Sequence, residues 1–250
     1  MTQDVAAVYT VAYNRPDLIE LQLASLRRLL REPFTYTVLN NAPDGEMDGE
    51  IVLSCAEAGV ACVPVPERSQ RSANVSHAWA LQWAWVHHVL PIRQGVAVFL
   101  DHDVFLVAPF SFVDLVSGHH LAALEQRRGQ VVYPWPGIIA LDMERIPRRE
   151  LMSFLCNPHL RGERVDVGGN LSEWIDNVAG YEDGRVDWYR LATSTLEGPE
   201  GYEEDFGFEL YEGSLLHYHA ASNWDRRSHH ARKTDYLRRW LAVAAPGTET

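Results

Sequence analysis

The chain has 250 residues, of which 46% are hydrophobic and 22% are charged, and its formal net charge is −12. A chain of this length can bury a large core without disulfides or metals to support it. The acidic balance argues against non-specific binding to nucleic acid or to an anionic membrane surface, so we expect no nucleic-acid partner. No apolar stretch reaches about 18 residues without a charge, so no transmembrane helix is predicted.

The cysteines and the N-terminus indicate the compartment. Cys55, Cys62 and Cys156 have no CxxC spacing, which argues against a zinc ribbon or a disulfide framework. The first residues lack a basic segment followed by a long apolar one, so no signal peptide is predicted. Both observations favour a reducing, cytoplasmic location.

In the first hundred residues, short apolar segments alternate with helical patterns. The sequence predicts strands at 5–12, 34–39, 60–65 and 96–100, and helices at 18–30, 50–58 and 72–90. This alternation is typical of an α/β fold whose central sheet is mostly parallel and flanked by helices. Such sheets bind ligands at the carboxyl ends of their strands.

After residue 110 the pattern changes. The sequence predicts helices at 112–116, 171–178 and 236–245, and strands at 120–125, 138–142 and 208–218. A rigid aromatic loop is expected at 131–137, where Pro134 and Pro136 flank Trp135. No Pro/Ser-rich linker and no internal repeat divide the chain, so we expect one domain over residues 1–250.

The apolar strand at 96–100 ends in Asp101-His102-Asp103. In an extended chain, side-chain alternation places Asp101 and Asp103 on one side and His102 on the other, where it is more plausibly structural. Two carboxylates at the carboxyl end of a buried strand are suited to a hard divalent metal and the phosphates that the metal carries. The alternative is a solvated turn after a core strand, but the chain returns at once to Val104, Phe105 and Leu106.

Other strand ends and one helix start also carry polar clusters. Tyr13-Asn14-Arg15 follows the first predicted strand, and Asn40 and Asn41 follow the second. Asparagine amides are suited to binding a nucleobase or a ribose, although each is also a common turn residue. Near the start of the helix at 72–90 lie Arg71, Asn74 and His77, where the helix N-terminus favours phosphates or a sugar hydroxyl. Capping by Ser69 or Ser72 is the alternative there.

In this order and over roughly residues 5–225, these motifs resemble the GT-A fold glycosyltransferases, a metal-dependent, Rossmann-like α/β family. Residues 13–16 resemble the family's first nucleotide-binding loop, and residues 101–103 resemble its DxD motif. The resemblance implies a nucleotide-binding half at 1–110, an acceptor half at 111–225 and a C-terminal helix within 226–250. The nucleotide-binding residues that we expect are Tyr13, Asn14, Arg15, Asn40, Asn41, Asn74, His77 and His102.

The resemblance also implies a metal centre. In the family the DxD carboxylates hold Mn²⁺ or Mg²⁺ against the donor diphosphate, and a histidine near the C-terminus is a third ligand. His217 is that ligand by resemblance, with His219 as the alternative, and an imidazole shifts the preference toward Mn²⁺. The alternative to metal binding is that both histidines are ordinary half-exposed residues. Residues 222–224 read Ser-Asn-Trp where retaining galactosyltransferase-like members have Lys-Pro-Trp, so the phosphate-binding lysine is not carried over.

The acceptor side is expected around residues 166–170. Asp166 is a candidate base or sugar ligand, and glycines allow a close approach of the backbone. Inverting members use a carboxylate in the region of the acidic cluster 203–205, so Glu204 is a second catalytic candidate, with a surface loop as the alternative. The expected acceptor or sugar residues are Trp135, Gly168, Gly169, Asn170, His219, Asn223 and Trp224.

The sequence therefore predicts a metal-dependent, hexosyltransferase-like enzyme. Its expected partners are a nucleoside-diphosphate sugar and a hydroxyl acceptor, and its expected cofactor is Mn²⁺ or Mg²⁺. The alternatives are a non-catalytic nucleotide- or carbohydrate-binding module of the same fold, a sugar-nucleotide pyrophosphorylase and a zinc hydrolase. A pyrophosphorylase usually has a glycine-rich loop after its first strand, and residues 11–14 contain no glycine.

Overall fold

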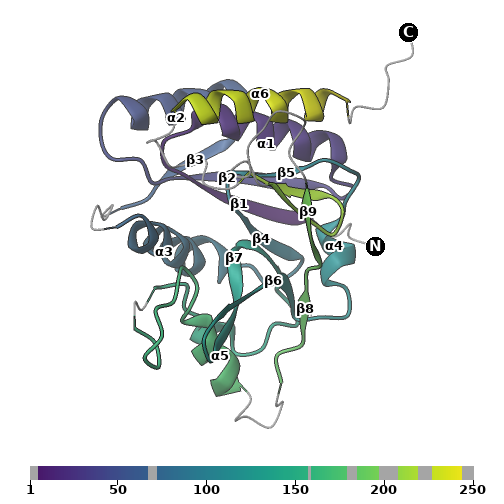
Figure 1. Ribbon diagram of the computed structural model, residues 1–250. Helices are drawn as coiled ribbons and strands as arrows, with labels where there is room; N and C mark the ends of the chain where they lie inside the picture. The colour runs from purple at the N-terminus through teal and green to yellow at the C-terminus, as the bar shows by residue number, and fades with distance from the viewer. Residues whose placement is uncertain are drawn as a thin grey trace.

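The computed structural model describes residues 5–66, 72–156, 159–178, 185–196, 208–218 and 227–243 (Figure 1). Within these ranges the larger sheet has seven strands in the order β3-β2-β1-β4-β7-β6-β8. The pairs β1–β2, β2–β3, β1–β4 and β6–β8 are parallel, whereas β7 is antiparallel to β4 and to β6. The strands are β1 (Ala6–Ala12), β2 (Phe34–Asn40), β3 (Ala61–Pro64), β4 (Val96–Leu100), β6 (Leu121–Arg128), β7 (Val131–Asp142) and β8 (Trp188–Arg190).

Helices cover both faces of this sheet (Figure 1). Two groups of helices pack on the sheet, and alternate residues of β4 face different groups. Val98 packs with residues of the first group, and Phe99 packs with residues of the second. This alternation follows from the two-residue period of a strand. The first group is α1 (Pro16–Leu29), α2 (Glu46–Ala58) and α4 (Phe112–Val116), and the second is α3 (Ala73–Ala84), the π-helical turn η1 (Trp85–Val89) and α5 (Leu171–Val178).

A smaller antiparallel sheet lies beside the larger one. In the described residues it has four strands in the order β5-β11-β10-β9. Leu18 of α1 and Phe105 of β5 share a third core with Leu237 of the C-terminal helix α6 (Arg227–Val243). The strands are β5 (Val104–Leu106), β9 (Thr193–Leu196), β10 (Phe208–Tyr211) and β11 (Leu215–His217); a 3₁₀ turn, η2, covers Arg149–Leu151.

The predicted fold class is confirmed, and several elements differ from their predictions. The expected loop at 131–137 is wrong, because these residues belong to β7. The register of β6 on β7 shifts between Ala123 and Leu124, so the ladder accommodates Pro136 and Gly137 as an irregularity. The expected strand at 208–218 is a hairpin, since Glu212 and Gly213 have positive φ angles of 51° and 64°.

Three short strands were not predicted, and α6 starts earlier than expected. Strand β5 follows β4 after only three residues, and β8 and β9 are three and four residues long. Helix α6 begins at Arg227, whereas the apolar pattern predicts a start at Tyr236. No helix in the described part of the chain is long and apolar enough to cross a membrane.

Candidate functional site

Residues 101–103 form a buried turn between the two sheets. The amide of Val104 donates to the carbonyl of Asp101 at 3.0 Å, which closes the turn. The Asp101 amide donates to the Gly137 carbonyl at 2.8 Å, and the Tyr218 amide donates to the Asp103 carbonyl at 2.8 Å. The expected extended geometry is therefore wrong. The solvated turn is wrong too, because His102 and Asp103 are each only 7% exposed.

Asp101 lies in a tight space between α3 and β7. Its Oδ1 atom is 3.2 Å from His77 Nε2, a distance at which a protonated imidazole and a carboxylate form an ion pair. A Cβ atom on Gly137 would lie 2.7 Å from Asp101 Oδ2 and 2.3 Å from the Trp135 ring. Only glycine fits at position 137, because any larger residue would displace the carboxylate or the indole.

The charges around Asp101 and His77 stabilise each other. Burial acts to raise the pKa of Asp101, but the charges of His77, His102 and His217 hold it below the usual value. Burial acts to lower the pKa of His77, but Asp101, Asp103 and Asp166 raise it above the usual value. These side chains form one electrostatic cluster in which carboxylates and imidazoles alternate.

His217 approaches the turn from β11. Its Nε2 atom is 3.7 Å from Asp103 Oδ1, and its ring lies 5.1 Å from the Trp135 ring. The Nδ1 atom lies 3.0 Å from the Tyr211 hydroxyl, and that hydroxyl donates to Glu209. Burial, followed by the hydrogen bond to Glu209, raises the pKa of Tyr211, so this hydroxyl keeps its proton.

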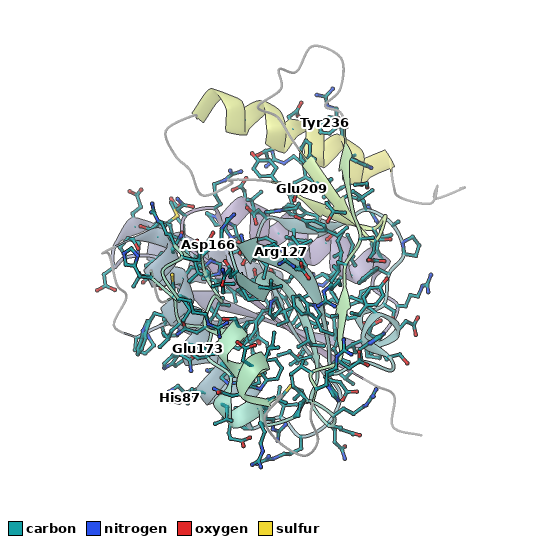
Figure 2. The ribbon with its side chains drawn as sticks, turned by 60° about the horizontal axis from the view of Figure 1, so that its bottom comes forward. His87, Arg127, Asp166, Glu173, Glu209 and Tyr236 are labelled. Carbon is teal, nitrogen blue, oxygen red and sulfur yellow. The ribbon has the colours of Figure 1, made fainter. Side chains whose placement is uncertain are left out.

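The hydrogen-bond directions set the tautomer of His217. An ionised carboxylate accepts and does not donate, so Tyr211 gives its proton to Glu209 and accepts from Nδ1–H of His217. In the neutral ring with its proton on Nδ1, the lone pair is on Nε2, the atom that faces Asp103. This tautomer is the one that a metal ligand requires. In the view of Figure 2, Glu209 lies between Tyr236 of α6 and the larger sheet.

The donor set fits a divalent metal by its chemistry. Asp101, Asp103 and His217 offer two carboxylates and one imidazole around a single turn, which is a set that suits Mn²⁺. In the ranges that the structure describes, no group of three or more His, Cys, Asp or Glu side chains has an arrangement that could hold a metal ion as it stands. The fit of Asp101, Asp103 and His217 to a metal is therefore one of donor chemistry and not of ligand geometry.

A pocket of about 260 Å³ opens beside the turn, between the ends of β1 and β2 and the start of α3. Asn41 donates from Nδ2 to Ser76 at 3.0 Å, and its buried Oδ1 has no hydrogen-bond partner in the described residues. Ser72 caps α3 by accepting from the Val75 amide at 3.2 Å, which is the capping that the sequence left open. The lining residues are Val11, Tyr13, Asn41, Ser72, Ala73, Asn74, Ser76, His77, Asp101, His102 and Asp103.

Five expected nucleotide-binding residues therefore lie together in the pocket: Tyr13, Asn41, Asn74, His77 and His102. Sequence reasoning missed Ser76. Its only signal is its place one turn after Ser72, on the same side of α3 as the pocket. Asn14 is 5% exposed and is not among the described lining residues.

Asn40 and Arg15 have structural contacts instead. Asn40 accepts from the Ala42 amide at 3.1 Å and donates to Asp48 Oδ1 at 3.0 Å, so it holds the loop after β2. Arg15 makes two 2.8 Å hydrogen bonds to Asp17 and one of 2.9 Å to Thr234 of α6. These contacts of Asn40 and Arg15 are therefore with other residues of this chain and not with the pocket.

The loop at 166–170 packs against β7. The Asp166 amide donates to the Tyr133 hydroxyl at 3.1 Å, and Asp166 Oδ1 accepts from the Val167 amide at 2.8 Å. Gly168 has a φ of +80°, and a Cβ atom there would lie 2.6 Å from the Pro136 ring. In the view of Figure 2, Asp166 lies at a height between Tyr236 of α6 and Glu173 of α5.

The remaining acceptor candidates are placed as follows. A Cβ atom on Gly169 would lie 2.4 Å from the Val165 side chain, so both glycines serve the packing of this loop. Asn170 Oδ1 is buried and has no hydrogen-bond partner among the described residues. Several of the expected or considered residues lie outside the described residues: Ser69, Arg71, the acidic cluster 203–205 with Glu204, His219, Asn223 and Trp224.

Known proteins match this chain in structure. No family model and no curated protein matches its sequence. A mannosyltransferase from Pyrobaculum calidifontis, solved with GDP-Man and Mn²⁺, is 17% identical, with a TM-score of 0.50 and coverage of 76% of this chain and 55% of that one. Glucosyl-3-phosphoglycerate synthase from Mycobacterium tuberculosis, solved with Mn²⁺, UDP and glucosyl-3-phosphoglycerate, is 18% identical, with a TM-score of 0.45 and coverage of 75% and 70%.

This chain thus spans about half the length of the mannosyltransferase. At 17% identity the likeness concerns the fold and not the activity. Together with the mostly parallel seven-stranded sheet, it shows that the chain has the GT-A fold of nucleotide-sugar glycosyltransferases.

Proposed function

We propose that this protein transfers a hexose from a nucleoside-diphosphate sugar to an acceptor hydroxyl, with Mn²⁺ in preference to Mg²⁺. The observation that carries the proposal is the buried turn at Asp101–Asp103, which lies between a pocket and the Nε2 atom of His217. Asp101, Asp103 and His217 would hold the metal. When bound, the metal would neutralise charge on the departing diphosphate.

The pocket is suited to the nucleotide. Ser72, Ala73 and Asn74 at the start of α3 line it, so the positive end of the helix dipole faces the space beside the carboxylates. The unpartnered Oδ1 of Asn41 is a buried acceptor that requires a donor from a ligand, such as a nucleobase N–H or a ribose hydroxyl. Tyr13, 40% exposed at the rim, offers an aromatic face for the base.

On the acceptor side, we propose that Asp166 and the Trp135 indole contact the sugar or the acceptor. Asp166 raises the pKa of His77, which places it within electrostatic range of the metal turn. Its Oδ1 is used by the loop backbone, so Oδ2 is the oxygen left to bind or deprotonate a hydroxyl. Gly168, Gly169, Asn170, His219, Asn223 and Trp224 complete the acceptor proposal, and Glu204 is the second candidate base.

Donor binding tests the proposal first. The protein is heated with a panel of nucleoside-diphosphate sugars, with Mn²⁺, Mg²⁺ or chelator, and unfolding is followed by fluorescence. A ligand at 100 times its Kd stabilises the folded state by about 2.7 kcal/mol, which is readily seen in Tm. We expect one nucleotide class to raise Tm only with metal.

Turnover is then measured with that donor as release of the nucleoside diphosphate. Chelator is expected to abolish it, and Mn²⁺ is expected to restore it. Full turnover in excess chelator would refute the metal-dependent mechanism. Donor binding with no metal dependence and no turnover would instead support a binding module of the same fold.

A further inference from the structure

Helix α1 buries two polar side chains on the face that it turns toward the core. Gln22 is fully buried and Ser25 is 1% exposed, although they lie among the buried residues Leu18, Ile19 and Leu26. A buried amide is costly unless its hydrogen-bonding groups are satisfied. Helix propensity and core packing would both be served as well by an apolar residue at position 22.

The amide of Gln22 binds both ends of the Asp101–Val104 turn. Its Nε2 donates to the Asp101 carbonyl at 2.6 Å and to the Val104 carbonyl at 2.7 Å. Its Oε1 accepts from the Tyr36 hydroxyl of β2 at 2.7 Å. Both amide protons are thus used on one turn, and Tyr36 fixes which end of the amide faces it.

We infer that Gln22 is a positioning residue for the metal site, and that Tyr36 orients it. The inference rests on the proposed function, since it assumes that Asp101 and Asp103 bind the metal. The side-chain directions of these two carboxylates depend on the backbone of the turn, which Gln22 fixes at two carbonyls. Groups that orient metal ligands through hydrogen bonds commonly contribute about 10- to 100-fold to metal affinity.

Ser25 provides a matched control one turn along the same helix. Its hydroxyl accepts from the Leu106 amide at 3.2 Å and donates to the Gln22 carbonyl at 2.7 Å. Ser25 therefore binds strand β5 beyond the turn, and neither of these two hydrogen bonds reaches Asp101 or Val104. A purely structural role predicts similar effects of substituting Gln22 and Ser25.

The experiment measures Mn²⁺ affinity by calorimetry, and the spectrum of bound Mn²⁺ by electron paramagnetic resonance, for the whole chain. Gln22→Met keeps the length of the side chain without its donors, and we expect Mn²⁺ to bind about 10- to 100-fold more weakly. Tyr36→Phe keeps the amide but releases its orientation, and we expect a smaller loss. Ser25→Ala is expected to lower Tm and to leave the Mn²⁺ affinity and spectrum unchanged.

The outcomes distinguish a failure of the inference about Gln22 from a failure of the proposed function. If the natural protein binds Mn²⁺ and both Gln22→Met and Tyr36→Phe bind it equally well, the inference is wrong and the proposed function stands. If Ser25→Ala weakens binding as much as Gln22→Met does, the role is structural and the inference is also wrong. If the natural protein binds no Mn²⁺, the proposed metal site itself fails. Should Gln22→Met not fold, Tyr36→Phe and Ser25→Ala still decide the question.

Discussion

Two polar turns follow neighbouring strands of the sheet and use their charges differently. After β1, Arg15 and Asp17 form one cation–anion pair with two hydrogen bonds, and Thr234 of α6 joins them. After β4, Asp101 lies 3.2 Å from the His77 imidazole, and Asp103 lies 3.7 Å from the His217 imidazole. The first turn pairs a guanidinium with a carboxylate, whereas the second places two carboxylates beside imidazoles.

This difference is informative about function. A pair such as Arg15–Asp17 satisfies itself and holds elements together. Two carboxylates that lie together need cationic or hydrogen-bonding partners, and the proposed cation would be one of them. Polar residue types alone do not distinguish the two turns, whereas the partners of each side chain in the fold do distinguish them.

The largest effect is expected when one carboxylate is removed from the second turn. We expect Asp101→Asn and Asp103→Asn each to reduce metal-dependent turnover by roughly 100-fold or more, because stabilising the departing diphosphate is worth several kcal/mol. Release of nucleoside diphosphate measures the effect. Asp114→Asn is the control, since that carboxylate on α4 is 74% exposed and lies 3.7 Å from Arg31. Equal turnover in all three variants would contradict the assignment.

The space around Asp101 can be tested without changing any charge. In Gly137→Ala the new methyl group would meet Asp101 Oδ2 and the Trp135 ring, and we expect a loss of about 1–3 kcal/mol in stability together with weaker Mn²⁺ binding. Gly49→Ala in α2 is the control because nothing lies within 4 Å of its Cβ. That variant should be more stable by about 0.5–1 kcal/mol. Chemical denaturation and calorimetry measure both quantities.

A smaller effect on Mn²⁺ affinity is expected when the hydrogen bond from His217 to Tyr211 is removed. Tyr211→Phe removes the acceptor for Nδ1–H, so the proton is free to move to Nε2, and we expect Mn²⁺ affinity to fall about 10-fold. Tyr189→Phe is the matched control, because its hydroxyl binds Glu212 at the surface at 3.2 Å. Unchanged Mn²⁺ affinity in Tyr211→Phe would show that the hydrogen bond does not set the tautomer.

The smallest effect on donor binding is expected at the first turn. Arg15→Met should lower stability by about 1–3 kcal/mol at neutral pH and leave the donor Kd unchanged. Burial acts to raise the pKa of Asp17, but Arg15 holds it below the usual value. The free energy that the Arg15–Asp17 pair contributes to folding is therefore fully present above the usual carboxyl pKa, and it is lost as pH falls through the lowered pKa of Asp17. The stability difference between the natural protein and Arg15→Met should shrink below about pH 4.

Much of the fold follows from local patterns. Strand β4 and helices α4 and α5 have the predicted bounds, because their apolar runs end at clear turn or cap residues such as Ser111. The register irregularity at Pro136 and the positive φ angles of Glu212 and Gly213 depend on contacts across strands. Such contacts are not visible in a single sequence.

The site was predictable to a similar degree. Two carboxylates at the end of an apolar strand pointed to Asp101 and Asp103, and the structure places them at a pocket. Asn40 binds its own loop and Asn41 lines the pocket, and this distinction depends on which side of the strand end each side chain occupies. Gln22 could not have been found, because its partners are 79 and 82 residues away in the sequence.

The turn at Asp101–Asp103 is also where the chain passes from the larger sheet into the smaller one. Asp101 follows β4 of the larger sheet, and His217 ends β11 of the smaller sheet, so an ion held by both residues would link the two sheets. Loading the site would then make the unfolding of the two sheets more cooperative. Amide hydrogens of β10 and β11 should exchange more slowly in the presence of Mn²⁺ and donor, while those in the centre of β1 change little.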